Sequence, residues 1–329
     1  MGKKRIIQEN IQGLVIFNHK KGSWLNKADR YTVEKNNLKD KVKFVNNFGP
    51  QTNRYIYRIN LMNESSFPIY EVNIKVIFPK FLNYLGSFPL TLNVQSSIEK
   101  DKGKINFLEI IIGELKEKSS KEIRLQYTPY LLPSTGEIRT IITYINNEGK
   151  SRILTSNPIE IQFDKIILTP KIIPNSQIGE FTQLKRTSRD LISFGIRMTK
   201  KMNLNKFFDI IESLFKVQNL QLITKDEEMG IIWFFGTDIQ SDTDILTLCK
   251  IGSNQFEIIA YSKNPFIHAS FLFLLTKILK EHISMKKTLK SKISIFELVC
   301  INCGAILLYF PRKGEYITCT KCNYEQIVW

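Results

Sequence analysis

The stretch YEVNIKVIF, residues 70–78, alternates apolar and polar side chains and ends at Pro79. A period of two places successive side chains on opposite faces of the chain, so this pattern predicts a β-strand with one buried face. The stretch YIYRINL, residues 55–61, shows the same alternation and stops at the polar turn sequence of residues 63–66. Short strands separated by turn residues are typical of an all-β domain.

Five further runs continue this pattern towards the C-terminus, at residues 90–94, 105–112, 122–127, 138–145 and 159–163. About seven short strands at this spacing predict an immunoglobulin-like β-sandwich, which we place at residues 42–165. The preceding residues, 1–41, contain one apolar run and are assigned to an N-terminal arm.

A different pattern begins at Leu191. Apolar residues recur at helical spacing over residues 204–215, and Asn264 followed by Pro265 favours the start of a second helix. Strand-like runs lie around the first helix, at residues 191–197, 230–235, 244–251 and 255–261. Together they predict an α+β platform, a sheet with two helices, at residues 191–283.

Both helices are expected to cover one face of this sheet and to leave the other face open for contact. We place four polar residues on the solvent side of the second helix: His268, Lys277, Lys280 and Glu281. Residues 166–190 contain two prolines and little pattern, which predicts a linker between the sandwich and the platform.

Composition and charge narrow the class of protein. The chain has 329 residues, of which 43% are hydrophobic and 11% aromatic, enough for several packed domains. The most apolar segment is residues 266–275, and the uncharged window around it, residues 264–276, is shorter than the roughly 20 residues of a membrane-spanning helix. No signal peptide is visible, so we expect a soluble, cytoplasmic protein. The net charge of +16 suggests nucleic acid or an anionic membrane surface as a partner, although lysine is spread over the whole chain, which favours a compositional origin.

Four of the five cysteines form two pairs near the C-terminus, Cys300 with Cys303 and Cys319 with Cys322. Each CxxC turn presents two thiolates, and two such turns complete the tetrahedral shell of a structural Zn²⁺ ion. Four thiolates leave no position open for a substrate, so we expect no catalysis at this ion. An iron centre of the rubredoxin type is the alternative, whereas a redox dithiol explains two pairs at this spacing poorly.

Gly304 and Asn323 follow the two pairs. Both residue types tolerate the left-handed backbone conformation, which turns backbone N–H groups towards the sulfur atoms. Residues 306–310 and 315–318 flank the turn at residues 311–314, which predicts the hairpin of a zinc ribbon at residues 296–329. About thirty residues cannot form an adequate hydrophobic core, so the metal must supply the folding energy.

A basic linker, residues 284–295, precedes the predicted ribbon. This linker and the tip of the ribbon contain the candidate contacts to anions: Lys286, Lys287, Lys290, Arg312 and Lys313.

No sequence motif points to catalysis. The three histidines are widely separated, and neither a phosphate-binding glycine loop nor a nucleophile motif is present. The remaining cysteine, Cys249, lies in an apolar run and is expected in the core. We therefore expect a protein that is not an enzyme and has no small-molecule substrate.

The stretches WFFGTD (residues 233–238), LTL (246–248) and FEIIAYS (256–262) precede the closing helix, and GELK (113–116) followed by EIRL (122–125) forms a late strand pair in the sandwich. In this order, residues 42–283 resemble the C-terminal appendage, or ear, of vesicle-coat subunits, the large clathrin-adaptor chains and the beta and gamma coatomer subunits. The resemblance implies a module that binds short peptides or a partner subunit in membrane trafficking, here with a zinc ribbon attached.

Ears of this family bind peptides partly through an aromatic pocket with a key tryptophan. That tryptophan would fall near residues 244–246, where this sequence has no aromatic residue, so the pocket is not carried over. The nearest aromatic residues, Trp233, Phe256 and Tyr261, are the candidate peptide contacts, although a core position is favoured for Trp233.

Two hypotheses of function follow. The first is a non-enzymatic interaction module of the appendage type, whose partner is a protein or a short linear peptide, with an anionic membrane surface as a further candidate. The second is a nucleic-acid-associated zinc-ribbon protein in transcription or translation, favoured by the ribbon and the positive charge. Binding to nucleic acid weakens steeply with added salt, which separates the two hypotheses.

Overall fold

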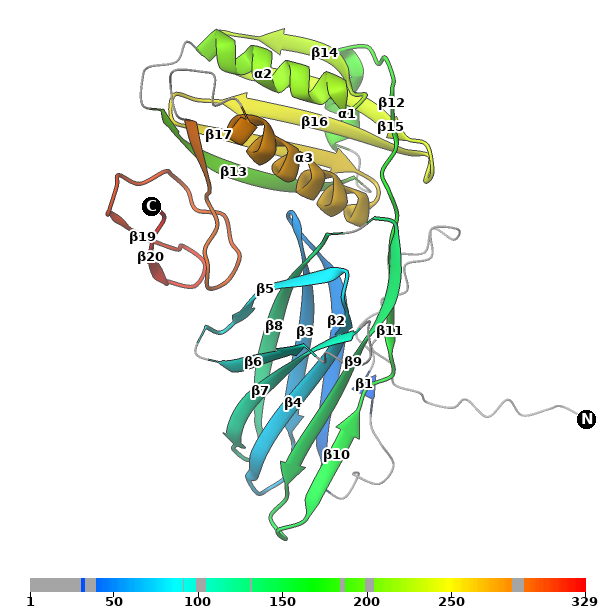
Figure 1. Cartoon of the computed structure of the whole chain (residues 1–329), viewed down its shortest axis with the longest axis vertical. Coiled ribbons are helices and arrows are strands. Elements are labelled where there is room, and N and C mark those ends of the chain that lie inside the picture. The colour runs from blue at the N-terminus through cyan, green and yellow to red at the C-terminus, as the bar shows by residue number, and fades with distance from the viewer. Residues whose placement is uncertain are drawn as a thin grey trace, which may run out of the picture. The chain divides into compact units, whose positions relative to one another are not determined.

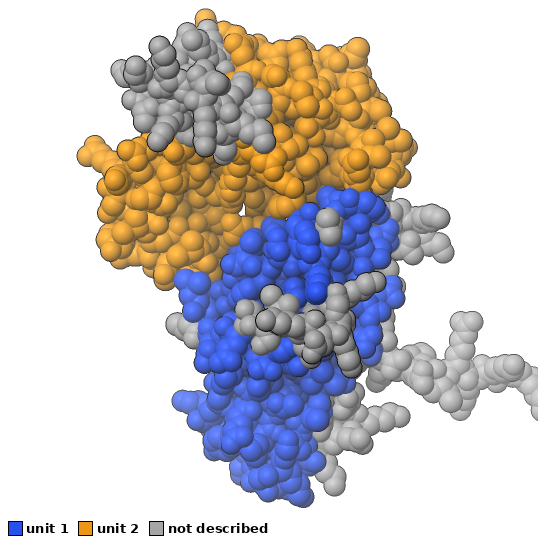
Figure 2. Space-filling view, viewed as in Figure 1, with its two compact units in different colours: residues 1–49, 56–164 blue, residues 50–55, 165–329 orange. Residues whose placement is uncertain are grey.

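The computed structural model describes residues 31–32, 40–90, 92–98, 105–130, 132–183, 187–198, 204–285 and 293–329. These residues fall into two compact units, which Figure 2 distinguishes by colour: Met1–Gly49 with Ile56–Asp164, and Pro50–Tyr55 with Lys165–Trp329. Most of the predicted N-terminal arm lies outside the described residues, as do Lys286, Lys287 and Lys290.

The first unit is a sandwich of two antiparallel sheets (Figure 1). The strand order is β1-β2-β3-β8-β5 in one sheet and β10-β9-β4-β7-β6 in the other, with β11 also paired to β9. The strands are β1 (Tyr31–Thr32), β2 (Val42–Gln51), β3 (Arg54–Asn63), β4 (Ile69–Pro79), β5 (Leu82–Phe88), β6 (Asn93–Ile98), β7 (Ile105–Leu115), β8 (Ser119–Pro129), β9 (Ser134–Ile145), β10 (Ser151–Thr155) and β11 (Ile159–Phe163).

The alternation at residues 70–78 is confirmed in β4, where Val72, Ile74 and Val76 are buried and the residues between them are not. The ring of Phe78 on β4 lies 5.1 Å from that of Tyr127 on β8, in the facing sheet. The two inner faces therefore share one core. The predicted runs do not include β2, β5 or β10, and of these β5 and β10 are edge strands with weak alternation.

The second unit is built on an antiparallel seven-stranded sheet in the order β12-β15-β16-β17-β13-β18, with β14 also paired to β15. Helices α2 (Leu204–Val217) and α3 (Pro265–Met285) cover one face, and the N–H of Phe266 donates to Asn264 Oδ1 at the predicted start of α3. The strands are β12 (Leu168–Pro170), β13 (Ser188–Met198), β14 (Gln221–Asp226), β15 (Ile231–Asp238), β16 (Thr243–Ile251), β17 (Gln255–Ser262) and β18 (Ile293–Glu297). Within the described residues, neither α2 nor α3 nor any other helix has the length and apolarity needed to cross a bilayer.

The second face of this sheet is not open, contrary to the sequence-based expectation. The predicted linker, residues 166–190, contributes β12 to the sheet and forms α1 (Ser176–Gln183), and side chains of this segment pack on the face opposite α2 and α3. The rings of Phe181 and Phe235 meet edge-on with centroids 5.6 Å apart. On β16, Leu246 and Leu248 point to this face and Ile245 to the other, so the sheet is apolar on both sides and needs a cover on both.

Replacing the main aromatic contact of α1 tests this cover. Phe181→Ala is expected to lower the free energy of unfolding by about 1–2 kcal/mol, less than a fully buried phenylalanine would, because Phe181 is half-buried. Urea denaturation measures the change, and Glu180→Ala, at an exposed position of the same helix, is the control. Equal stability of the two variants would show that α1 contributes nothing as a cover.

Candidate metal centre

Two tight turns present the four paired cysteines. The N–H of Gly304 donates to the carbonyl of Cys300 at 2.8 Å, and the N–H of Asn323 donates to the carbonyl of Cys319 at 2.8 Å. The φ angles of Gly304 and Asn323 are 72° and 56°, so the predicted left-handed conformation is confirmed at both positions. Glycine and asparagine adopt this conformation at low cost, and each turn is therefore built from its own local sequence.

The turns bring the four sulfur atoms into one cluster. The Sγ atoms of all four cysteines lie within 4.8 Å of one another. The distance is 3.6 Å between Cys300 Sγ and Cys322 Sγ and also 3.6 Å between Cys303 Sγ and Cys319 Sγ. Zinc–sulfur bonds of about 2.3 Å at tetrahedral angles require sulfur atoms roughly 3.8 Å apart, so the cluster can hold one metal ion.

The electrostatics of the cluster favour a bound cation. Burial raises the pKa of the Cys300 and Cys303 thiols. Burial also raises the pKa of Cys322, but hydrogen bonds to its sulfur atom lower it by more, and the pKa is about 7. The largest of these hydrogen-bond effects comes from the N–H of Tyr324. Several thiolates this close together repel one another, and a divalent cation removes that cost because it binds the thiolate form.

The pairing of strands around the cysteines differs from the predicted hairpin. Strand β19 (Tyr316–Thr318) pairs with β20 (Glu325–Ile327), not with residues 306–310, and Val299 forms a single bridge with Ile306. Each CxxC turn therefore closes its own short hairpin. The reason is local, because each turn reverses the chain and brings its own flanking residues together.

Two amide side chains connect the turns. Gln326 contacts the backbone on both sides of Cys300, and Asn302 Nδ2 lies 3.5 Å from Cys322 Sγ. Sequence analysis does not identify either residue, because a polar side chain beside a short strand ordinarily indicates exposure. Gln326 is in fact buried.

The cysteine cluster is continuous with the seven-stranded sheet. Strand β18 pairs with β13 at the sheet edge, and the N–H of Leu298 donates to the carbonyl of Ser193 at 2.9 Å, two residues before Cys300. The predicted basic linker, residues 284–295, thus ends in a strand of the sheet.

Aromatic rings hold the cysteine-bearing segment, residues 298–329, against the sheet. The ring centroid of Phe310 lies 5.6 Å from that of Phe296 on β18 and 5.3 Å from that of Trp329. The Nε1–H of Trp329 donates to the carbonyl of Pro311 at 2.8 Å. Phe310 covers Gly195 of β13 so closely that a Cβ there would lie 2.2 Å from a ring carbon. The segment therefore packs on the sheet of the second unit.

The candidate peptide contacts lie on opposite faces of the sheet. Phe256 is fully buried between Phe194 and Phe207 beneath α2, so it cannot contact a peptide, and that assignment is wrong. Trp233 and Tyr261 lie on the other face with ring centroids 6.2 Å apart, in the cluster that α1 joins. Their role in binding remains a hypothesis.

The other residues singled out from the sequence differ in exposure. Arg312 and Lys313 are exposed at the turn between the two hairpins. Cys249 is fully buried in the core, as expected.

His268 was expected on the solvent side of α3, and this expectation is wrong, because the side chain is fully buried. Its Nδ1 atom lies 3.4 Å from Ser188 Oγ and 3.6 Å from the Asp190 carboxylate. Both residues lie at the start of strand β13. The hydroxyl and the carboxylate face the same ring nitrogen. In a nucleophile–base relay they face different nitrogens, so this trio does not have the geometry of a catalytic triad.

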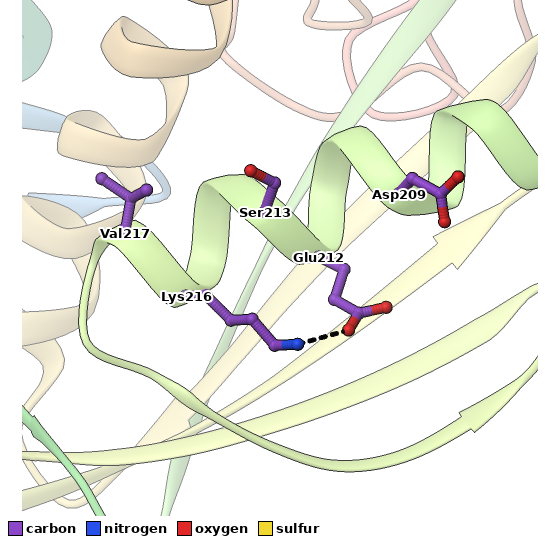
Figure 3. A pocket seen from close by; sticks show the side chains of 5 residues that line it. All are labelled: Asp209, Glu212, Ser213, Lys216 and Val217. Carbon is purple, nitrogen blue, oxygen red and sulfur yellow. Dashed lines mark hydrogen bonds and ion pairs between the residues drawn. The ribbon is translucent and has the colours of Figure 1, made fainter.

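Two surface cavities do not gather a catalytic set of groups. One, of about 500 Å³, is lined by α2 residues that include Asp209, Glu212 and Lys216, and Glu212 and Lys216 form an ion pair along the helix (Figure 3). The other, of about 730 Å³, lies on the sandwich beside Phe81 and Tyr130.

Comparisons with known proteins identify no family. No family model matches the chain, and no curated protein matches it. Among solved structures, an uncharacterised protein from Nocardia farcinica with an immunoglobulin-like fold is similar at 11% identity and a TM-score of 0.25, over 36% of this chain and 96% of that one. A non-cellulosomal cohesin from Archaeoglobus fulgidus is similar at 11% identity and a TM-score of 0.24, over 37% and 91%. The major pilin subunit of Bacillus cereus is similar at 10% identity and a TM-score of 0.27, over 71% and 74%. These scores are too low to carry an inference about function.

Proposed function

We propose that this chain is a non-enzymatic protein-interaction module of the coat-adaptor appendage type, with a structural zinc ion at its four-cysteine site. The order of a sandwich followed by a sheet with helices supports the appendage assignment and a role in membrane trafficking. Zinc is proposed because four thiolates on two CxxC turns form a closed tetrahedral set. A cytoplasmic location is proposed because reduced thiols persist there.

The observation that carries this proposal is the apolar surface of the cysteine-bearing segment. Leu308 is 72% exposed, Tyr316 64% and Ile327 47%, and Tyr316 stands directly opposite Ile327 in the β19–β20 pair. A segment that needs a metal to fold, yet leaves such side chains in solvent, has the character of a contact surface for another protein. This surface replaces the open sheet face as the proposed binding site, since α1 covers much of that face.

Leu308→Asp combined with Tyr316→Asp is expected to abolish capture of the protein partner without loss of zinc, because both side chains are exposed and neither is a ligand. The measurement is affinity capture from cell extract treated with nuclease, with metal analysis of each purified variant. The matched control is Arg312→Ser combined with Lys313→Ser, which changes exposed charges of the same segment. Equal capture by wild type and the aspartate variant would contradict the proposal.

Nucleic acid is the second candidate partner, favoured by the exposed Arg312 and Lys313 beside these apolar residues. If it is the partner, nuclease abolishes capture, and the serine variant binds DNA or RNA more weakly than wild type does. The affinity of the wild-type protein for nucleic acid then also falls steeply between low and physiological salt, because binding releases counterions from the phosphates. Contact between apolar side chains responds weakly to salt.

A further inference from the structure

The side chain of Gln326 turns inward from the middle of β20. Only 6% of the residue is exposed, whereas its neighbours on the strand, Glu325 and Ile327, are exposed. A buried carboxamide is costly unless both its oxygen and its nitrogen find partners. The partners of Gln326 therefore show what the burial achieves.

Both ends of this carboxamide contact the backbone around the first metal ligand. The N–H of Ile301 donates to Gln326 Oε1 at 2.8 Å, and Gln326 Nε2 donates to the carbonyl of Val299 at 3.1 Å. These two peptide groups lie immediately before and after Cys300. One group is a donor and the other an acceptor, and the carboxamide of Gln326 satisfies both because it carries an acceptor oxygen and a donor nitrogen.

The contact joins the two halves of the cysteine cluster. Gln326 follows Cys322 by four residues and belongs to the hairpin of the second CxxC turn, whereas Val299 and Ile301 belong to the first. The side chain thus fixes the backbone at Cys300 relative to the hairpin that carries Cys322. The Sγ atoms of these two cysteines are 3.6 Å apart, close to the spacing that a tetrahedral zinc ion requires.

We propose that Gln326 is a positioning residue of the metal site, which holds the first CxxC turn at the distance from the second at which four sulfur atoms bind one ion. The inference rests on the proposed zinc site. Residues that orient metal ligands without touching the metal typically contribute about 10–100-fold to affinity. Gln326 acts in this way through the backbone of a ligand.

The test compares wild type, Gln326→Met and Glu325→Gln in the full-length chain. Methionine has a similar length and shape but makes neither hydrogen bond, and Glu325 is an exposed neighbour on the same strand. Zinc affinity is measured by competition with a chromophoric chelator, and ligand geometry by the visible absorption of the Co²⁺-substituted protein. We expect Gln326→Met to bind zinc about 10–100-fold more weakly and to show altered Co²⁺ bands, and Glu325→Gln to match wild type.

The outcomes separate this inference from the proposed zinc site. If Gln326→Met binds zinc within twofold of wild type with the same Co²⁺ spectrum, Gln326 does not position the site, although the zinc site stands. If wild type binds neither metal, the zinc site itself fails. Should Gln326→Met not fold, Gln326→Asn provides the second variant, since its carboxamide is one methylene too short to reach both peptide groups, and the same readouts apply.

Discussion

Chelation of the metal, or the substitution Cys300→Ser, is expected to unfold residues 298–329 while the β-sandwich stays folded. The physical reason is the small apolar core of this segment, in which the buried apolar side chains are Leu298, Val299, Leu307 and Ile317. Binding of Zn²⁺ by small domains contributes roughly 10–16 kcal/mol of apparent free energy at neutral pH. Burial of four side chains at about 1.5–3 kcal/mol each cannot replace that contribution once backbone entropy is counted.

Metal analysis should find one zinc ion per wild-type chain, and limited proteolysis should cut the C-terminal segment only after chelation. Loss of the metal should also expose Trp329, whose indole is half-buried against Phe310, and so shift its fluorescence to longer wavelength. Cys249→Ala is the matched control, because this cysteine is buried in the core away from the cluster. A chelated protein that keeps a protease-resistant C-terminus would overturn the assignment of a structural metal.

Gly195→Ala is expected to detach the cysteine-bearing segment from the sheet. An added Cβ would lie 2.2, 2.4 and 2.5 Å from three carbons of the Phe310 ring. At these distances either the Phe310 ring or the backbone at residue 195 must move. Displacement of the ring also breaks its stacking with Phe296 and Trp329. Overpacking costs about 1–3 kcal/mol, and each aromatic pair about 0.5–1.5 kcal/mol, so the expected loss of stability is several kcal/mol.

Urea denaturation followed by tryptophan fluorescence measures this loss. Gly179→Ala on α1 is the control, because a Cβ there meets no atom within 4 Å. Phe310→Ala in the Gly195→Ala background should restore part of the stability, since it removes the ring that clashes. If Gly195→Ala and Gly179→Ala are equally stable, the close contact between Phe310 and Gly195 is not present in solution.

Local patterns predicted several features correctly. The period of two at residues 70–78 predicts a strand with one buried face because alternate side chains must point to opposite sides. Asn264 and Pro265 predict the start of α3 because their side chains suit the first turn of a helix. Gly304 and Asn323 predict left-handed turns because few other residues adopt that conformation at low cost.

Contacts between distant segments were not predictable in this way. Strand β18 follows a lysine-rich stretch and gains its partner from β13, about a hundred residues earlier in the chain. Helix α1 has eight residues, and the two apolar side chains that pack on the sheet, Ile178 and Phe181, are only partly buried, so its apolar pattern is too short to indicate packing. The buried ring of His268 faces Ser188 and Asp190 at the start of β13, and that strand begins earlier than its apolar pattern suggests.

For the candidate metal centre, the sequence alone determines which four sulfur atoms are presented, because two CxxC turns with a left-handed residue after each are set by interactions within a few residues. Tertiary structure decides where that centre lies and how it is held. Phe310 rests on a glycine of β13, and Gln326 spans the two turns, and both contacts join residues that folding alone brings together. Backbone preferences depend on residues close in sequence and can be predicted from it. The packing of a buried face depends on side chains that are distant in sequence, so the sequence pattern around that face does not identify them.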